Sequence, residues 1–269
     1  MRFSHQRGCV SEVSGDEFFH LGMDELHWDC WDVPHINTWM ATVGIAPGDH
    51  KAVARYYLER VQTILAKRGK RGIVWNEAFD QYGAATYPPA TPAPRQLRAD
   101  TVVHLWFSPT WYDPPTGLPV AKTLEQVVGT GRDALISFPW YLSANASAGP
   151  SFESLYLQDV QSNKTCATGA HGELNCTCFG RNGDVEDSCY DVSDRPELLR
   201  RVLGGEAALW GEAVNGANVE AATFMAAAVV AERLWSPRTT LDVADARRRL
   251  GAMRAVMRGR GLAPAGMPP

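Results

Sequence analysis

The adjacent carboxylates Asp24 and Glu25 are the clearest candidates for acid–base chemistry in this sequence. They follow an apolar run at residues 17–21 and Gly22, where a buried strand would end. In parallel α/β folds, functional side chains gather at the carboxyl ends of the strands. Two carboxylates there can cleave a glycosidic bond, because one protonates the leaving oxygen while the other supports the developing positive charge. An Asp-Glu pair also occurs in solvated turns, so its position carries this prediction.

Tryptophan marks the ends of the other predicted strands. Four of the five predicted strands end in, or run directly into, an indole: Trp75, Trp106, Trp140 and Trp210. Each could simply close the core, but together they predict one pocket that holds a sugar ring against π surfaces, with its hydroxyls bonded to carboxylates. Polar neighbours support this prediction: Asn76, Glu77, Tyr141 and Glu212. His20 is interpreted either as a buried, hydrogen-bonded core residue or as part of a network behind the carboxylates.

The spacing of apolar residues predicts an α/β fold with a parallel sheet and crossover helices. The expected strands are residues 17–21, 72–75, 101–106, 134–138 and 202–210. The expected helices are residues 49–67, 120–128, 220–234 and 243–257. Asp49 is the expected N-cap of the first helix and Gly69 its expected stop.

Composition excludes several classes of protein. The 269 residues hold 26 Lys plus Arg against 30 Asp plus Glu, a net charge of −4, which does not suit nucleic-acid binding. No apolar stretch approaches the roughly 18–20 residues of a membrane span. A glycine loop that could cradle phosphate is absent from the sequence, so we expect no nucleotide, and we predict no metal or other cofactor.

Cysteine usage indicates the secretory route. The six cysteines are Cys9, Cys30, Cys166, Cys176, Cys178 and Cys189. For the four in residues 163–190, disulfides are favoured over structural zinc, because Cys176 and Cys178 are one residue apart and His171 is the only nearby imidazole. Sequons at Asn145, Asn163 and Asn175 agree with a lysosomal, vacuolar or extracellular location. The first residues lack the apolar region of a signal peptide, so the protein is cytosolic or its start is missing.

The stretch His20-Leu21-Gly22-Met23-Asp24-Glu25 resembles the His-x-Gly-Gly-Asp-Glu signature of the family 20 glycoside hydrolases, the β-N-acetylhexosaminidases. Later blocks resemble the family in the same order: Val74-Trp75-Asn76-Glu77, Val103-His104-Leu105-Trp106, Pro139-Trp140-Tyr141-Leu142, Gly204-Gly205-Glu206-Ala207-Ala208-Leu209-Trp210-Gly211-Glu212 and Ala231-Glu232-Arg233-Leu234-Trp235-Ser236. The resemblance covers residues 12–264, leaving residues 1–11 and a tail, 265–269, outside it. It implies a partial (β/α)8 TIM barrel, roughly strands 4 to 8 with their helices, carrying a Cys-rich insert at 163–190.

The resemblance also implies a substrate-assisted retaining mechanism, in which the substrate's own 2-acetamido oxygen attacks. The substrates would be glycans or chitin oligomers that end in N-acetylglucosamine or N-acetylgalactosamine, and a homodimer is compatible with the family. By analogy, Glu25 would be the general acid and base, Asp24 would orient the acetamido N–H, and Tyr141 would bind the acetamido oxygen. The remaining implied roles are the acetyl pocket for Trp75, Trp106 and Trp140, the sugar platform for Trp210, and hydroxyl binding for Glu212.

Two departures from the family pattern bear on these expectations. Met23 replaces the second glycine of the signature, and a positive φ there would strain the turn. Five strands cannot close an eight-stranded barrel and would leave two open sheet edges, so we expect a part of a longer enzyme. A non-catalytic glycan-binding protein is the alternative, although Asp24, Glu25 and Tyr141 as a set argue against it. A family 18 chitinase would need an Asp-x-x-Asp-x-Asp-x-Glu motif, which the sequence lacks.

Overall fold

The computed structural model describes residues 15–82, 97–106, 124–142, 150–162, 164–168, 174–179, 185–186, 191–212, 214–266 and 268. The predicted α/β class is confirmed, with parallel strands in the order β1-β2-β3-β4-β8. The chain divides into two compact units: unit 1 comprises Met1–His104 and Gly131–Asp133, and unit 2 comprises Leu105–Thr130 and Ala134–Pro269.

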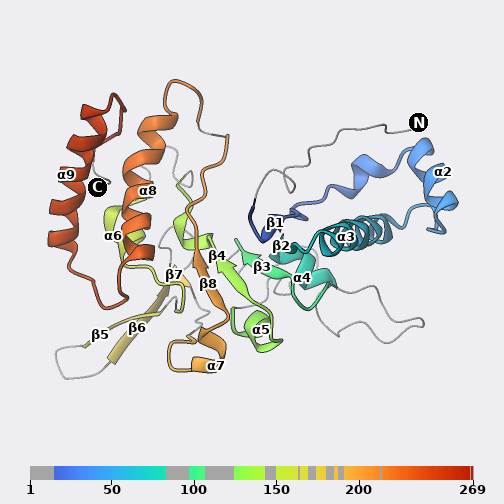
Figure 1. Ribbon diagram of the computed structural model, residues 1–269, viewed down its shortest axis with the longest axis horizontal. Helices are drawn as coiled ribbons and strands as arrows, with labels where there is room; N and C mark the ends of the chain where they lie inside the picture. The colour runs from blue at the N-terminus through green and yellow to red at the C-terminus, as the bar shows by residue number, and fades with distance from the viewer. Residues whose placement is uncertain are drawn as a thin grey trace. The chain divides into compact units, whose positions relative to one another are not determined.

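In unit 1, parallel strands carry the predicted catalytic turn. β1 (Phe18–His20) pairs with β2 (Arg71–Trp75), and β2 pairs with β3 (Val102–Leu105). The sequence predicted these three strands and a parallel sheet. The long helix α3 (His50–Lys67) connects β1 to β2 and packs against β2 (Figure 1). Its N-cap is confirmed, because the Asp49 side chain accepts a hydrogen bond from the Ala52 N–H at 3.0 Å. Gly69 follows the helix with φ +65°, a conformation that glycine adopts without strain.

Three short helical segments of unit 1 were not predicted. They are η1 (Trp28–Trp31), α2 (Pro34–Thr42) and α4 (Asn76–Tyr82). Proline at the first position of α2 is a recognisable start signal, because a helix does not need that N–H. α4 begins directly after β2, so Asn76 and Glu77 lie on a helix and are both buried.

In unit 2, two parallel strands are shorter than predicted. β4 (Ala134–Ile136) is followed by the 3₁₀ helix η2 (Phe138–Trp140), because Pro139 has no N–H to donate to a strand ladder. β8 (Val202–Gly205) pairs with β4 and stops at Gly205. Trp75 and Trp106 therefore lie at strand ends as predicted. Trp140 and Trp210 do not, which corrects that part of the strand prediction.

Helices make up most of the rest of unit 2. They are α5 (Leu124–Gly129), α6 (Phe152–Tyr156), α7 (Pro196–Leu199), α8 (Val219–Trp235) and α9 (Val243–Gly259). α8 and α9 match their predictions and lie side by side (Figure 1). Residues 120–123 of the helix predicted at 120–128 lie outside the described residues. Glu232 on α8 forms an ion pair with Arg249 on α9 and accepts a 3.4 Å hydrogen bond from the Tyr156 hydroxyl on α6.

The Cys-rich segment forms a small antiparallel sheet of three strands. These are β5 (Lys164–Thr168), β6 (Leu174–Phe179) and β7 (Val185–Glu186), and Cys166 on β5 is the register partner of Cys176 on β6. The cysteine side chains of this segment lie outside the described part of the structure, so disulfide bonding stays the prediction and structural zinc the alternative to it. No helix in the described ranges is both long and apolar enough to cross a membrane.

Candidate active site

The turn after β1 holds Asp24 and Glu25 in an unusual backbone conformation. Gly22 has φ +73°, Met23 φ +84° and Glu25 φ +43°. The strain predicted at Met23 is therefore present, because a side chain in the left-handed region costs about 1–2 kcal/mol. The Met23 side chain is buried, whereas Glu25 is exposed to solvent.

Hydrogen bonds tie this turn to its neighbours. The Gly22 carbonyl accepts from the Trp75 N–H at 3.0 Å, and the Gly22 N–H donates to His20 Nδ1 at 3.0 Å. Farther along, the Glu25 N–H donates to Oε1 of the buried Glu77 at 3.3 Å. In the sequence Glu77 stands out only as a polar neighbour of Trp75, and its contact with the candidate acid was not predicted.

An apolar cavity of about 630 Å³ lies against the turn within unit 1. Met23 and Asp24 line it together with Trp39, Tyr57 and other side chains of α2 and α3. The buried Met23 side chain therefore borders an apolar space, which leaves room beside the turn for a bulky residue at the position of the signature's second glycine.

His20, Trp75 and His104 form a ring cluster behind the turn. His20 Nε2 lies 3.3 Å from His104 Nδ1, and the Trp75 ring stacks on His104 with centroids 4.2 Å apart. Burial, together with a smaller effect of the neighbouring His20, lowers the pKa of His104 to about 3. Burial also lowers the pKa of His20, while the charge of Asp24 opposes that shift.

These contacts decide between the two interpretations of His20. His20 keeps contact with solvent although its ring is partly buried, so a fully buried core position is wrong, and both ring nitrogens make hydrogen bonds. His20 therefore belongs to a network next to Asp24. His104 was missed as a member of that network. Its signal was its place two residues before Trp106, on the same face of a strand.

In unit 2, three aromatic side chains form a row. The Tyr141 ring stacks on Trp106 with centroids 6.2 Å apart and lies 6.3 Å from the tilted ring of Trp210. Tyr141 and Trp106 are buried, whereas Trp210 is 39% exposed. Glu212, two residues farther on, is exposed. An exposed indole beside a carboxylate has the chemistry to stack on a sugar ring and bind its hydroxyls.

Trp140 occupies a core position in this structure. Its side chain is 0% exposed, and its indole N–H donates to the Leu155 carbonyl at 2.9 Å. A Cβ on Gly205 would lie 2.4 Å from the Trp140 ring, so glycine is required there for the two segments to pack. The role of Trp140 in an acetyl pocket stays a prediction.

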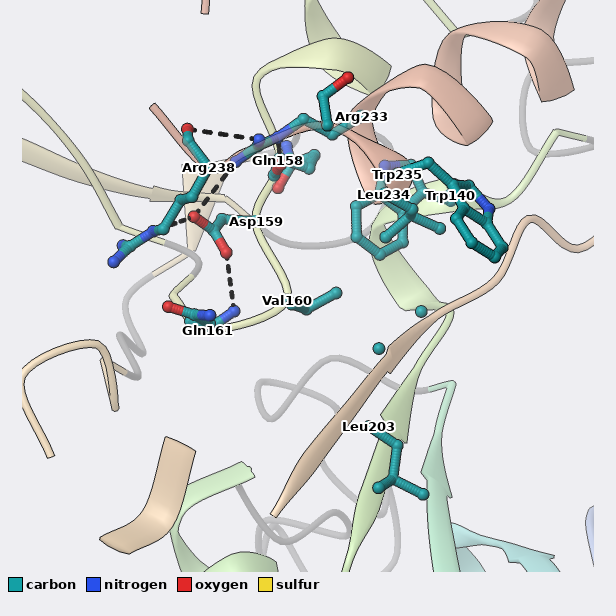
Figure 2. Close-up of a pocket in the computed structure, with 13 residues that line it drawn as sticks. Trp140, Gln158, Asp159, Val160, Gln161, Leu203, Arg233, Leu234, Trp235 and Arg238 are labelled. Carbon is teal, nitrogen blue, oxygen red and sulfur yellow. Dashed lines mark hydrogen bonds and ion pairs between the residues drawn. The ribbon is translucent and has the colours of Figure 1, made fainter. Parts of the chain in front are cut away.

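A second cavity, of about 420 Å³, lies between the end of α8 and residues 158–161 in unit 2 (Figure 2). The buried Arg233 donates to the Gln158 carbonyl at 2.7 Å and to Asp159 at 3.2 Å. Arg238 forms an ion pair with the same carboxylate. These charges hold the loop to the helix, so the block at residues 231–236 acts in packing, and its arginine is not a free ligand-binding group.

Metal-binding side chains do not cluster in the described ranges: no group of three or more His, Cys, Asp or Glu residues there could hold an ion. The predicted site residues fall into two sets. His20, Asp24, Glu25 and Trp75 belong to unit 1, while Trp106, Trp140, Tyr141, Trp210 and Glu212 belong to unit 2.

Comparison with known families agrees with the sequence motifs. The model of the glycosyl hydrolase family 20 catalytic domain matches residues 9–238. This chain belongs to family 20. Its family 20 match includes the turn of Asp24 and Glu25 and the aromatic row of unit 2.

Individual relatives show how much of such a protein is present. The chain is 31% identical to the beta-hexosaminidase subunit beta of Mus musculus over 255 residues, which are 94% of this chain and 38% of the mouse protein. The human subunit beta is 29% identical, with 94% and 36% covered. The chain thus spans about two fifths of the curated relatives it matches.

Solved structures agree on the fold. The exo β-N-acetylglucosaminidase of Vibrio harveyi, solved with N-acetylglucosamine, has a TM-score of 0.61 at 18% identity, covering 96% of this chain and 34% of its own. The β-N-acetylhexosaminidase of Bacteroides fragilis has a TM-score of 0.60 at 14% identity, covering 96% and 44%. The fold is therefore that of part of a family 20 catalytic domain, in agreement with the partial barrel predicted from the sequence.

Proposed function

We propose that this chain is part of a β-N-acetylhexosaminidase that removes terminal N-acetylglucosamine or N-acetylgalactosamine from glycans or chitin oligomers. The observation that carries the proposal is the family 20 match over residues 9–238, with Asp24 and Glu25 adjacent on an anchored turn after a parallel strand. The names of the relatives support it, since both mammalian proteins are beta-hexosaminidase subunits.

In the proposed reaction, the carbonyl oxygen of the substrate's 2-acetamido group attacks the anomeric carbon, and water later opens the oxazolinium intermediate with net retention. Glu25 donates a proton to the leaving oxygen and then removes one from the attacking water. Asp24 accepts a hydrogen bond from the acetamido N–H and stabilises the positive charge of the intermediate. The Tyr141 hydroxyl donates to the acetamido oxygen.

Aromatic residues bind the sugar in this proposal. Trp210 forms the platform under the ring, which its exposure supports. Glu212 accepts hydrogen bonds from the outer hydroxyls, and its exposure leaves it available to do so. The walls of the acetyl pocket are Trp75, Trp106 and Trp140.

Hydrolysis of 4-nitrophenyl N-acetyl-β-glucosaminide by the longer protein that contains this chain, with the 269-residue chain assayed beside it, tests the proposal. Glu25→Gln should lower kcat by about 10²–10⁴-fold, the usual contribution of a general acid. Binding of N-acetylglucosamine, followed by tryptophan fluorescence, should persist in that variant. Glu197→Gln, an exposed carboxylate on α7, is the matched control and should keep full activity. A longer protein that binds the sugar and hydrolyses nothing would contradict the proposal.

A non-catalytic glycan-binding protein is the second candidate, and the strained Met23 in the turn is the observation that favours it. Under this alternative the wild-type chain binds N-acetylglucosamine without turnover, and Glu25→Gln changes nothing measurable. The two candidates therefore differ in one assay with one variant.

We also propose that the protein enters the secretory route, to a lysosomal, vacuolar or extracellular location. The sequons at Asn145, Asn163 and Asn175 support this location, as do the four clustered cysteines. Glycosidase digestion of the protein from its natural source would shift its mobility if the sequons carry glycans. A homodimer, compatible with the family, would be seen by light scattering.

A further inference from the structure

The hydrogen bonds of His20 fix which of its ring nitrogens carries the proton. The Gly22 N–H donates to His20 Nδ1 at 3.0 Å, so Nδ1 must present a lone pair. A neutral imidazole then carries its proton on Nε2. That nitrogen lies 3.3 Å from His104 Nδ1, which must accept the hydrogen bond. The same rule then places the proton of His104 on its own Nε2.

Protonation of either ring would break this chain of donors and acceptors. A second proton on His20 would sit on Nδ1 and oppose the Gly22 N–H. A second proton on His104 would sit on Nδ1 and face the Nε2–H of His20. His20 could not change its tautomer without losing the hydrogen bond from the Gly22 N–H. The charge that acts on the pair from the turn is that of Asp24, which raises the pKa of His20 against the effect of burial. Burial keeps the pKa of His104 far below its ordinary value, so the neutral state persists at neutral pH.

The turn needs such an anchor because its backbone is strained. Gly22, Met23 and Glu25 all have positive φ. Residues in this region persist only when surrounding contacts over-determine them, and such strain is common at active sites. The anchors on the described residues are the Trp75 N–H on the Gly22 carbonyl, Glu77 on the Glu25 N–H, and His20 on the Gly22 N–H. Among these anchors, only the hydrogen bond that His20 accepts from the Gly22 N–H depends on a tautomer. The His104 ring, which accepts from the Nε2–H of His20, fixes that tautomer.

We propose that His20 and His104 are positioning residues: a pair of neutral imidazoles, each protonated on Nε2, that holds the turn of Asp24 and Glu25 in its strained conformation. Neither touches the reacting atoms in this role, and both act through the Gly22 N–H. The catalytic consequence rests on the proposed hexosaminidase function, whereas the tautomers and the anchored turn do not. A catalytic group displaced by about 1 Å can lose about 10²-fold in rate, which sets the scale of the expected effect.

The first test needs no variant. ¹⁵N NMR of the imidazoles in the wild-type chain separates protonated from unprotonated ring nitrogens. We expect both His20 and His104 to show an unprotonated Nδ1 and a protonated Nε2 at pH 7. A proton on Nδ1 of either ring, or a charged ring at that pH, would overturn the proposal.

The second test uses matched variants. His20→Asn keeps an acceptor near the position of Nδ1, His20→Ala removes it, and His35→Ala on the exposed side of α2 is the control. Amide exchange at Gly22 should be about three- to tenfold faster in His20→Ala than in the wild type, the equivalent of one net hydrogen bond. In His20→Asn and His35→Ala it should stay within about twofold of the wild type. Equal exchange in His20→Ala and the wild type would refute the anchor.

Turnover separates this inference from the proposed function. With an active wild type, His20→Ala should lower kcat by about 10–100-fold with KM nearly unchanged, and His20→Asn should restore most of the loss. Equal kcat in the wild type and His20→Ala would overturn the positioning role. An inactive wild type with the expected tautomers and Gly22 protection would contradict the proposed function while supporting the anchored turn.

Discussion

The conformation of Met23 leads to a stability prediction with an unusual sign. Met23→Ala and Met23→Gly both remove a side chain that is 7% exposed, so the cost of the lost packing largely cancels between them. At φ +84°, alanine keeps a strain of about 1–2 kcal/mol that glycine does not have. Glycine loses about 0.5–1 kcal/mol through the greater freedom of its unfolded chain. We therefore expect Met23→Gly to be the more stable variant by about 0.5–1 kcal/mol.

Met40 provides the matched control within the same unit. It is fully buried and lies in α2, where glycine is less favourable than alanine by about 0.8–1 kcal/mol. The order of the two variants should therefore invert between positions 23 and 40. Urea or thermal unfolding of unit 1, followed by tryptophan fluorescence, measures both pairs. A difference of 1 kcal/mol corresponds to about 4–8 °C in Tm for a domain of 60–100 residues, close to the size of unit 1.

If the alanine variant were more stable than the glycine variant at both positions, the reasoning would be refuted. That result would mean that position 23 does not need a left-handed backbone. The turn would then be unstrained, and the anchoring role given to His20 would lose its physical reason.

Three further predictions concern packing and pH. Gly205→Ala should destabilise unit 2 by more than about 2 kcal/mol, because the new Cβ would lie 2.8 Å from the Ile136 carbonyl oxygen. Gly211→Ala, which has open space around it, is the control and should cost less than about 0.5 kcal/mol in the same thermal unfolding experiment. Equal costs for the two variants would contradict this prediction. Asp159→Asn should lower the free energy of unfolding by about 3–5 kcal/mol, because it leaves the charge of Arg233, whose side chain is 5% exposed, without its carboxylate. Asp245→Asn, which removes the carboxylate of an exposed ion pair, is the control and should cost less than about 1 kcal/mol. Similar costs for the two variants would refute the role of the buried pair. His104 has a folded-state pKa of about 3 and an ordinary pKa of 6.5, so between these pH values the unfolded chain binds the proton and the folded chain does not. The free energy of unfolding should therefore decrease by up to about 1.4 kcal/mol for each unit by which the pH is lowered from 6.5 to 3. His104→Asn should flatten the stability–pH curve in that window, and parallel curves would show that the imidazole is not buried neutral.

Local signals explain which elements were predictable. Asp49 and Gly69 marked the ends of α3 because capping depends on residue type and backbone conformation within one turn of helix. The strands of unit 1 were recognisable as short apolar runs between polar breaks. β4 and β8 were predicted too long, because an apolar run that ends just before Pro139 or passes through Gly205 looks the same whether it stays extended or turns.

The network behind the carboxylates was not predictable from local patterns. His20 and His104 are 84 residues apart, and their contact depends on the register of β1, β2 and β3. A single sequence does not reveal the register of parallel strands, because the crossover helices set it through packing. Glu77 was noticed for its position after Trp75, but its bond to the Glu25 N–H requires the helix that begins directly after β2.

Motif residues also differ in what they do, and the structure separates them. Trp140 and Arg233 both lie in blocks that resemble the family, yet one packs against Gly205 and the other holds a loop to α8. Gly205→Ala alters packing within unit 2, so the protection of the Gly22 N–H within unit 1 should persist in that variant.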